Sequence, residues 1–218
     1  AFMSLGGPTG SSASDLRAGA THAAMAGFHA SAATGYVALG DEAQRQHSDV
    51  EAETHYTAAL RHCTDEALHV RQLALAGRAQ VRMRLQRFRD AQIDLQLARA
   101  VAQKRADVDG ATNLVLQEAM VCDWLEDVDA AQQLALDGRS QLDALQSAET
   151  RVRVDLATGR SMFRQGRHVE SAIWLGDVAA DAREVGDHES EVIALMMQAS
   201  ALCLRGSIPL AEQAFMQA

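Results

Sequence analysis

The chain has 218 residues, of which 48% are apolar but only 4% aromatic. This length can bury the core of one ordinary domain, and the scarcity of aromatic residues favours packed helices over sheets. A formal net charge of −9 argues against a nucleic-acid partner, which needs a basic surface. No apolar run approaches the roughly 20 residues that span a bilayer, so no membrane partner is expected.

The cysteines and the N-terminal segment indicate a reducing, cytoplasmic setting. Cys63, Cys122 and Cys203 form no CxxC pair, which argues against a disulfide framework and a zinc ribbon. Cys122 is expected on a core face, as a buried and inert thiol. Residues 1–13 are rich in Gly and Ser and lack the order of a signal peptide, so they are predicted to be a flexible lead-in.

The first helical segment begins near Asp15. Apolar residues then recur in steps of three and four, which predicts a helix to about Gln46. Ser48 or Asp49 can cap a second helix, so residues 14–64 make the first hairpin. Its helices are separated by seven more residues than later ones, which is about two helical turns. The sequence leaves open whether Gly40–Ser48 is helix or loop.

Four further helix pairs follow. They are expected at about 65–86 and 89–106, 108–126 and 128–146, 148–166 and 168–185, and 188–205 and 208–218. Short polar residues stand where first helices should begin, Gly186 suits a helix end, and Pro209 suits a first turn. The expected capping residues are Asp65, Asp107, Ser147 and Asp187.

A step of forty residues relates these pairs. Small residues recur at Ala79, Ala119, Gly159 and Ala199, and again at Ala91, Ala131, Ser171 and Ala211. Small side chains at fixed positions let neighbouring helices approach closely, so the chain is predicted to be an all-α protein, an α-solenoid of about five antiparallel helix hairpins. We expect one domain over residues 14–218, with repeats near 14–64, 65–106, 107–146, 147–186 and 187–218.

The chain resembles the tetratricopeptide repeat (TPR) family over about residues 27–218. The segments that carry the resemblance are YVALGD (36–41), RFRDA (87–91), QGRHVES (165–171) and RGSIPLAEQAFMQA (205–218). The period is similar to that of the long variant, of about 40 residues, found in bacterial signalling and regulatory proteins. The resemblance implies a right-handed superhelix whose concave groove, lined by the first helix of each hairpin, binds peptides or partner helices. The pattern is broken at Arg82, Asp155, His168 and Ser171.

The resemblance also implies which residues line the groove. The candidates are Arg84, Asn113, Met120, Trp124, Arg153, Arg160, Phe163 and Arg164. Arg153, Arg160 and Arg164 are seven and four residues apart, so they share one helix face. Because guanidinium groups pair well with carboxylates, one hypothesis is that this patch holds an acidic segment of a partner. The alternative is a solvated arginine face without a ligand.

A second basic stretch, residues 71–105, holds nine basic residues against two acids. Without aromatic residues for base stacking, it indicates a solvated face or an intramolecular complement to the acidic repeats.

Neither a metal site nor a catalytic site is expected. His55, His62 and His69 are seven residues apart, with an expected helix break between the last two, whereas helical zinc sites space their ligands by three or four. His29 is expected on a helix surface. Since no nucleophile elbow, phosphate-binding loop or HExxH motif occurs, we expect no enzyme and no cofactor.

These observations favour a non-catalytic protein–protein interaction module or scaffold that binds a partner peptide or helix. The alternative is a sensory or regulatory domain of a larger signalling protein, of the transcriptional regulator, cyclase or kinase type. Such a domain binds a small effector or relays a conformational change. The last helix carries Ile208, Ala211, Phe215 and Ala218 on one face, which predicts a truncated last repeat or a homo-oligomer formed through this end.

Overall fold

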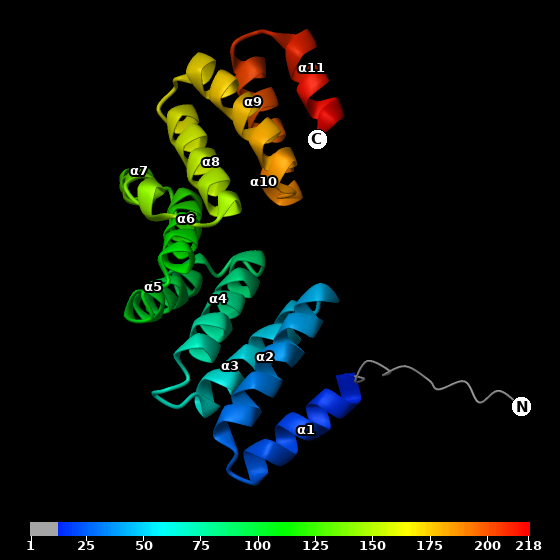
Figure 1. Cartoon of the computed structure of the whole chain (residues 1–218). Helices are drawn as coiled ribbons and strands as arrows, with labels where there is room; N and C mark the ends of the chain where they lie inside the picture. The colour runs from blue at the N-terminus through cyan, green and yellow to red at the C-terminus, as the bar shows by residue number, and fades with distance from the viewer. Residues whose placement is uncertain (1–12) are drawn as a thin grey trace, which may run out of the picture. The chain divides into compact units, whose positions relative to one another are not determined.

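A computed structural model describes residues 13–218. The predicted lead-in lies outside the described residues, except for Ala13, at which the first helix begins. In the described range the chain forms eleven α-helices, one short 3-10 helix and no strand (Figure 1). The predicted all-α fold class is confirmed.

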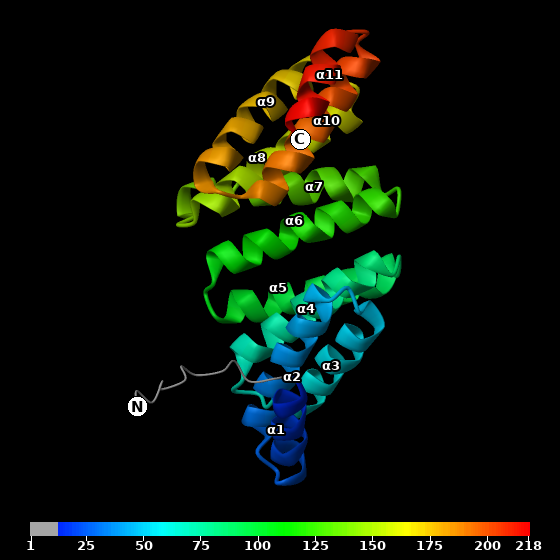
Figure 2. The ribbon, with the colours of Figure 1, turned by 90° about the vertical axis from the view of Figure 1, so that its right-hand side faces the viewer.

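The chain divides into two compact units, residues 1–101 and 102–218. The first contains α1 (Ala13–Met25), α2 (His29–Arg45), α3 (Asp49–His62), α4 (Leu68–Arg84) and most of α5 (Phe88–Lys104). The second contains α6 (Val108–Trp124), α7 (Val128–Arg139), η1 (Leu142–Ala144), α8 (Ala148–Arg164), α9 (His168–Val185), α10 (His188–Leu204) and α11 (Ile208–Gln217). Within the first unit α1 to α4 pack in succession, and within the second α6 to α11 do the same (Figure 2). The single domain over residues 14–218 stays a prediction.

The forty-residue step is visible in the helix boundaries. The helices α4, α6, α8 and α10 begin at residues 68, 108, 148 and 188, and α5, α7, α9 and α11 begin at 88, 128, 168 and 208. Every predicted small position is buried, including Ala79 and Ala199, which have no exposed surface. Each hairpin therefore packs through the same small residues, and the fold is an α-solenoid of helix hairpins.

The start of the chain differs from the prediction. A turn around Gly27, whose φ is 78°, ends α1 at Met25 and lets α2 begin at His29, so the continuous helix to Gln46 is wrong. Gly40 lies inside α2, and only residues 46–48 form a turn. The helices α2 and α3 begin at residues 29 and 49, the same offset as α4 and α5. The first hairpin therefore has no additional residues, and α1 is an extra helix ahead of it.

Residues in the left-handed region mark most connections between helices. Their φ values lie between 52° and 81°, and they are Gly27, His47, Gln86, Ala106, Glu126, Gly166, Gly186 and Gly206. Half of them are not glycine, although this conformation costs a side-chain-bearing residue roughly 1–2 kcal/mol. Glycine alone therefore could not have revealed the regular spacing of the turns.

Three of the four predicted helix caps are confirmed. The side chains of Asp107, Ser147 and Asp187 accept hydrogen bonds from backbone N–H groups three residues on, at 2.9, 3.1 and 3.2 Å. Gly186 ends α9 in the left-handed conformation, and Pro209 stands in the first turn of α11, both as predicted. The hydrogen bonds of Asp107, Ser147 and Asp187 satisfy backbone N–H groups that have no partner inside the helix.

Two predicted boundaries are wrong. Asp65 caps no helix, because α4 begins at Leu68 after a turn. The helix expected to run to residue 146 ends at Arg139, and η1 follows. The chain leaves the helix there so that Leu145, only 2% exposed, can pack against buried side chains of α6 and α8.

Tyr56 of α3 is the central side chain of the first unit. Its ring has no exposed surface and lies between Gly40 of α2 and Gly77 of α4, where a Cβ would collide with it. The hydroxyl lies 2.6 Å from Asp41 Oδ1 and 2.8 Å from Gln44 Oε1. Burial, and then Asp41, raise the pKa of the Tyr56 hydroxyl, which therefore stays protonated and donates a hydrogen bond.

The basic stretch of the first unit has an intramolecular complement. Asp94 of α5, 1% exposed, accepts two hydrogen bonds from Arg78 at 2.8 and 2.7 Å and one from Arg82 at 2.8 Å. Arg82 also donates to Glu53 of α3 at 2.8 Å. The arginine that replaces an apolar residue of the family pattern thus joins α3, α4 and α5.

Ser171 and His168 also have structural explanations. Ser171 is fully buried, and its hydroxyl donates to the carbonyl oxygen of Gly159 at 3.0 Å, so a polar group replaces alanine without an unmet hydrogen bond. His168 lies edge-on to Phe163, with ring centroids 5.2 Å apart. Both substitutions keep the contact between α8 and α9.

We predict that Gly40→Ala and Gly77→Ala each lower the free energy of unfolding by about 1–3 kcal/mol, the usual cost of overfilling a core. A Cβ on Gly40 would lie 2.6 Å from the Tyr56 ring. The matched control is Gly19→Ala in α1, where a Cβ meets nothing within 4 Å and alanine should stabilise the helix by about 0.5–1 kcal/mol. Urea denaturation measures all three, and an unchanged stability of G40A contradicts this packing.

We predict that Asp94→Asn lowers the free energy of unfolding by about 3–5 kcal/mol, because it removes the buried carboxylate that Arg78 and Arg82 share and leaves Arg82 with Glu53 alone. The control is Asp90→Asn, which removes an exposed ion pair with Arg87 and should lower the stability much less. Equal losses in urea denaturation would show that the buried pairing contributes nothing of its own.

Candidate functional site

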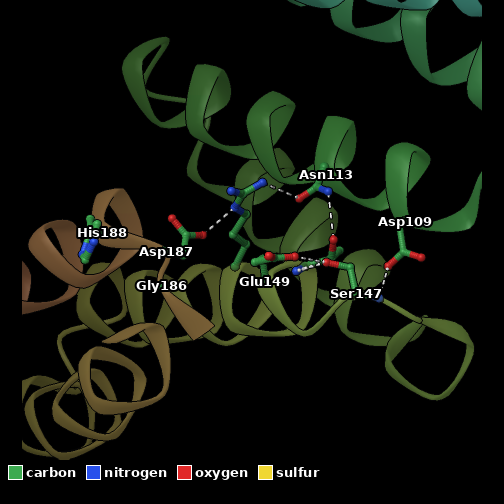
Figure 3. A pocket seen from close by; sticks show the side chains of 9 residues that line it. Asp109, Asn113, Ser147, Glu149, Gly186, Asp187 and His188 are labelled. Atoms are coloured by element: carbon green, nitrogen blue, oxygen red, sulfur yellow. Dashed lines mark hydrogen bonds and ion pairs between the residues drawn. The ribbon is translucent and has the colours of Figure 1, made fainter. Parts of the chain in front are cut away.

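The second unit contains a cleft of about 560 Å³. It lies where the first turns of α6, α8 and α10 come together (Figure 3). These are the first helices of three successive hairpins. The lining residues are Asp109, Asn113, Ser147, Glu149, Thr150, Arg153, Gly186, Asp187 and His188.

Side chains of α6 hold the start of α8 on one side of the cleft. The Asp109 carboxylate accepts hydrogen bonds from the backbone N–H groups of Gln146 at 3.2 Å and Ser147 at 3.0 Å. Asn113 Nδ2 donates to Thr150 Oγ1 at 2.9 Å. These bonds join residues 37 or 38 positions apart, so they connect one repeat to the next.

On the other side of the cleft, Arg153 of α8 contacts the start of α10. Its Nε donates to Asp187 Oδ2 at 2.8 Å, and its Nη1 lies 3.5 Å from Asn113 Oδ1. Burial acts to raise the pKa of Asp187, but hydrogen bonds from Arg153 and Ser190 outweigh it and hold that pKa below its usual value. The Arg153 side chain is 43% exposed, so its guanidinium still faces solvent in the cleft.

Most of the residues that line the cleft have polar or charged side chains, and together they carry a net negative charge. Asp109, Glu149 and Asp187 bring three carboxylates against the single guanidinium of Arg153. The helix N-termini add partial positive charge, which Asp187 and the other capping side chains offset. The cleft therefore offers both hydrogen-bond donors and acceptors, with an excess of negative charge.

The three arginines of the predicted patch line two different cavities. Arg153 lines the cleft, whereas Arg160 and Arg164 line a much smaller cavity beside α7. Arg160 Nη2 lies 2.5 Å from Asp123 Oδ2, and Arg164 Nε lies 3.7 Å from Asp123 Oδ1. Burial lowers the pKa of Arg160, while Asp123 opposes this effect. A carboxylate of the chain itself thus neutralises part of the patch.

The other predicted groove residues are dispersed. Phe163 is half-buried against buried residues of α9, α10 and α11 and does not line the cleft. Met120 is half-buried, and Trp124 is 63% exposed at the end of α6. Arg84 lies in the first unit, where it pairs with Asp49 at 3.3 Å. Of the eight candidates, Asn113 and Arg153 line the cleft.

The sequence contained a signal for the cleft that the groove assignment did not use. The sequence pattern predicts Ser147 and Asp187 as helix caps, and the family resemblance implies no role for Asp109, Glu149 or His188. The caps recur at the forty-residue step, which places the first turns of successive first helices on the same side of a solenoid. Polar residues near those caps were therefore candidates for a common surface.

The last helix is only partly covered. Ala211 and Ala214 are buried, but Ile208, Phe215 and Met216 are 50%, 49% and 88% exposed. Ala211 packs in a cluster with buried residues of α9 and α10, while its neighbours Ile208 and Phe215 stay half-exposed. Self-association through this end stays a prediction.

Within residues 13–218, no helix combines the length and apolar character that crossing a membrane requires.

Comparisons with known proteins support the fold. No family model and no curated protein matches the sequence. Among solved structures, BtubC (BKLC) from P. vanneervenii is similar with a TM-score of 0.71 and 13% identity, over 94% of this chain and 87% of that one. A Rap protein complexed with competence and sporulation factor is similar with a TM-score of 0.72 and 16% identity, over 87% of this chain.

Both neighbours are helical repeat proteins, and at such low identity the likeness shows the fold alone. The chain spans about half the length of Rap, since it covers 52% of that chain. The predicted TPR-like helical repeat is therefore confirmed as a fold.

We predict that Arg160→Gln lowers the free energy of unfolding by about 1.5–3 kcal/mol, because it removes a charge-assisted hydrogen bond to a largely buried carboxylate. Arg164→Gln is the matched control, since this side chain is 48% exposed and its single ion pair is long, so the loss should stay below about 1 kcal/mol. Thermal unfolding in parallel measures both. A larger loss of stability in R164Q than in R160Q would contradict the assignment of Arg160 as the main ion-pair partner of Asp123.

Proposed function

We propose that the chain is a non-catalytic protein-interaction module whose second unit binds a segment of a partner protein in the cleft of Figure 3. The observation that carries the proposal is the convergence of polar side chains from α6, α8 and α10 on one cavity. A volume of about 560 Å³ lies within the roughly 300–1,000 Å³ of ligand pockets. It suits a few residues of a peptide better than a whole protein surface.

The side chains of the cleft suit a peptide backbone. A peptide presents an N–H donor and a C=O acceptor at each residue, and both need partners when the peptide leaves water. The exposed guanidinium of Arg153 donates, and the carboxylate of Glu149 accepts. Because Asp109, Asn113 and Asp187 are already fixed by hydrogen bonds, the binding surface is pre-organised, which lowers the entropic cost of binding.

The charge of the cleft favours a neutral or basic partner segment. The hypothesis of an acidic segment assumed that Arg153, Arg160 and Arg164 face a ligand together. In the structure Arg153 is bonded to Asp187 and Arg160 to Asp123, and the carboxylates outnumber the arginine in the cleft. An acidic segment would meet repulsion there, whereas a lysine or arginine side chain would meet Glu149.

One comparison supports a second candidate, a regulatory domain of a larger signalling protein. The Rap structure was solved in complex with a competence and sporulation factor, and it is about twice as long as this chain. In this proposal the same cleft receives an effector, and the change is relayed to a further domain. A bacterial and cytoplasmic setting belongs to this proposal.

A peptide library displayed on phage tests the proposal. Peptides selected on the full chain should be enriched in lysine and arginine, and their affinity should fall as salt is added. Synthetic copies of the selected peptides should bind Asn113→Ala and Glu149→Gln about tenfold more weakly than the parent chain, provided that circular dichroism shows both variants folded. The matched control is Arg89→Ala, an exposed residue of α5 in the first unit, which should leave the affinity unchanged.

Selection of acidic peptides would contradict the proposed charge preference. Peptides whose affinity is the same for the parent chain, N113A and E149Q would exclude the cleft as the binding site.

A further inference from the structure

Two histidines of the first unit meet although they are 33 residues apart. His29 is the first residue of α2 and His62 is the last residue of α3, and these helices pack together. Their Nδ1 atoms are 3.3 Å apart, and the ring centroids are 5.6 Å apart with 26° between the ring planes. That centroid separation is about the largest that two imidazoles can have at this Nδ1 distance. The rings therefore meet edge to edge, with each Nδ1 directed at the other.

This arrangement places two nitrogen lone pairs at one point. Without a ligand, the two nitrogens can share a hydrogen bond if one Nδ1 carries a hydrogen and the other accepts it. Neutral imidazole nitrogen is also the commonest metal ligand in proteins. Two nitrogens 3.3 Å apart, each about 2.0–2.1 Å from one ion, subtend about 107° at that ion, close to the tetrahedral angle. An ion can therefore replace the shared proton after a tilt of the two rings.

Tyr36 packs against His62, whereas His29 is open to solvent. The ring of Tyr36 lies against His62 with centroids 5.7 Å apart and 14° between the planes. His29 is exposed, so an ion can enter from solvent. The ring of His55 also lies near that of Tyr36, with centroids 6.4 Å apart, and His55 Nε2 is 3.4 Å from Glu51 Oε1. The partner of His62 is therefore His29, and not His55 or His69, which are seven residues away from His62 in the sequence.

We propose that His29 and His62 bind one divalent transition-metal ion of the class that prefers imidazole, such as Ni²⁺, Cu²⁺ or Zn²⁺. Residues 13–218 hold no group of three or more His, Cys, Asp or Glu side chains suited to a metal, so water fills the remaining positions. The affinity is therefore lower than that of a four-ligand structural site. The proposal is independent of the cleft, because both ligands belong to the first unit.

Isothermal titration of NiCl2 into the full chain tests the proposal. One ion should bind per chain. His29→Gln and His62→Gln should each weaken binding by more than about tenfold, because even the mutation of a residue that only supports a metal ligand lowers metal affinity by about 10–100-fold. The matched controls are His69→Gln, an exposed histidine at the start of α4, and Cys63→Ser, which removes the thiol beside His62. Both controls should bind like the parent chain.

Thermal unfolding gives a second readout that separates metal binding from misfolding. Ni²⁺ should raise the melting temperature of the parent chain, because the folded state alone presents the pair, and should leave that of H29Q and H62Q unchanged. Absence of saturable binding overturns the proposal, as does binding that survives in H29Q and H62Q or is lost in H69Q or C63S.

Discussion

The close approach of helices at small residues is the constraint on which the rest of the structure depends. Ala79 and Ala199 have no exposed surface, and Ala119 and Gly159 are buried at the equivalent positions. A larger side chain there would separate two helices along their whole length, because packed interiors have no spare volume. Repetition at a forty-residue step gives each hairpin a small-residue contact at the same position as in the one before.

The cleft follows from that repetition. Since α6, α8 and α10 begin forty residues apart, their first turns lie on the same side of the second unit, and so do their capping residues. Asp187 illustrates the double role, because it caps α10 and also holds Arg153 of the preceding first helix. Side chains that connect one repeat to the next thereby become the wall of a cavity. The same contacts fix the geometry of the cleft and position the groups that a partner would meet.

Periodic features of the fold could be predicted from the sequence, and features that depend on a single pairing could not. The small residues and the caps at Asp107, Ser147 and Asp187 are repeated, so each supports the others. The turn at Gly27 was missed because the apolar spacing continues through it, and the early end of α7 depends on one buried leucine, Leu145. Non-glycine residues such as Ala106 in left-handed turns are also invisible to a search for glycine.

The candidate site shows the same division. Asn113 and Arg153 line the cleft on the side of the first helices, a position that follows from helical periodicity, and their role in binding a partner stays a prediction. The pairing of Arg160 with Asp123 joins residues 37 positions apart, and nothing local in the sequence indicates that this arginine is satisfied within the chain. The contact of His29 with His62 likewise joins residues far apart in the sequence, 33 positions in this case. Long-range polar pairs decide which charged groups remain for a ligand, and only the packed structure reveals them.

Hydrogen exchange measured by mass spectrometry tests the central claim most directly. A selected peptide added to the full chain should slow exchange in the peptides that cover the first turns of α8 and α10, around residues 147–153 and 186–190. Exchange in α1 and α3 should not change. Protection confined to the first unit, or to α7 and α9 without the first turns of α8 and α10, would contradict the assignment of the cleft as the binding site.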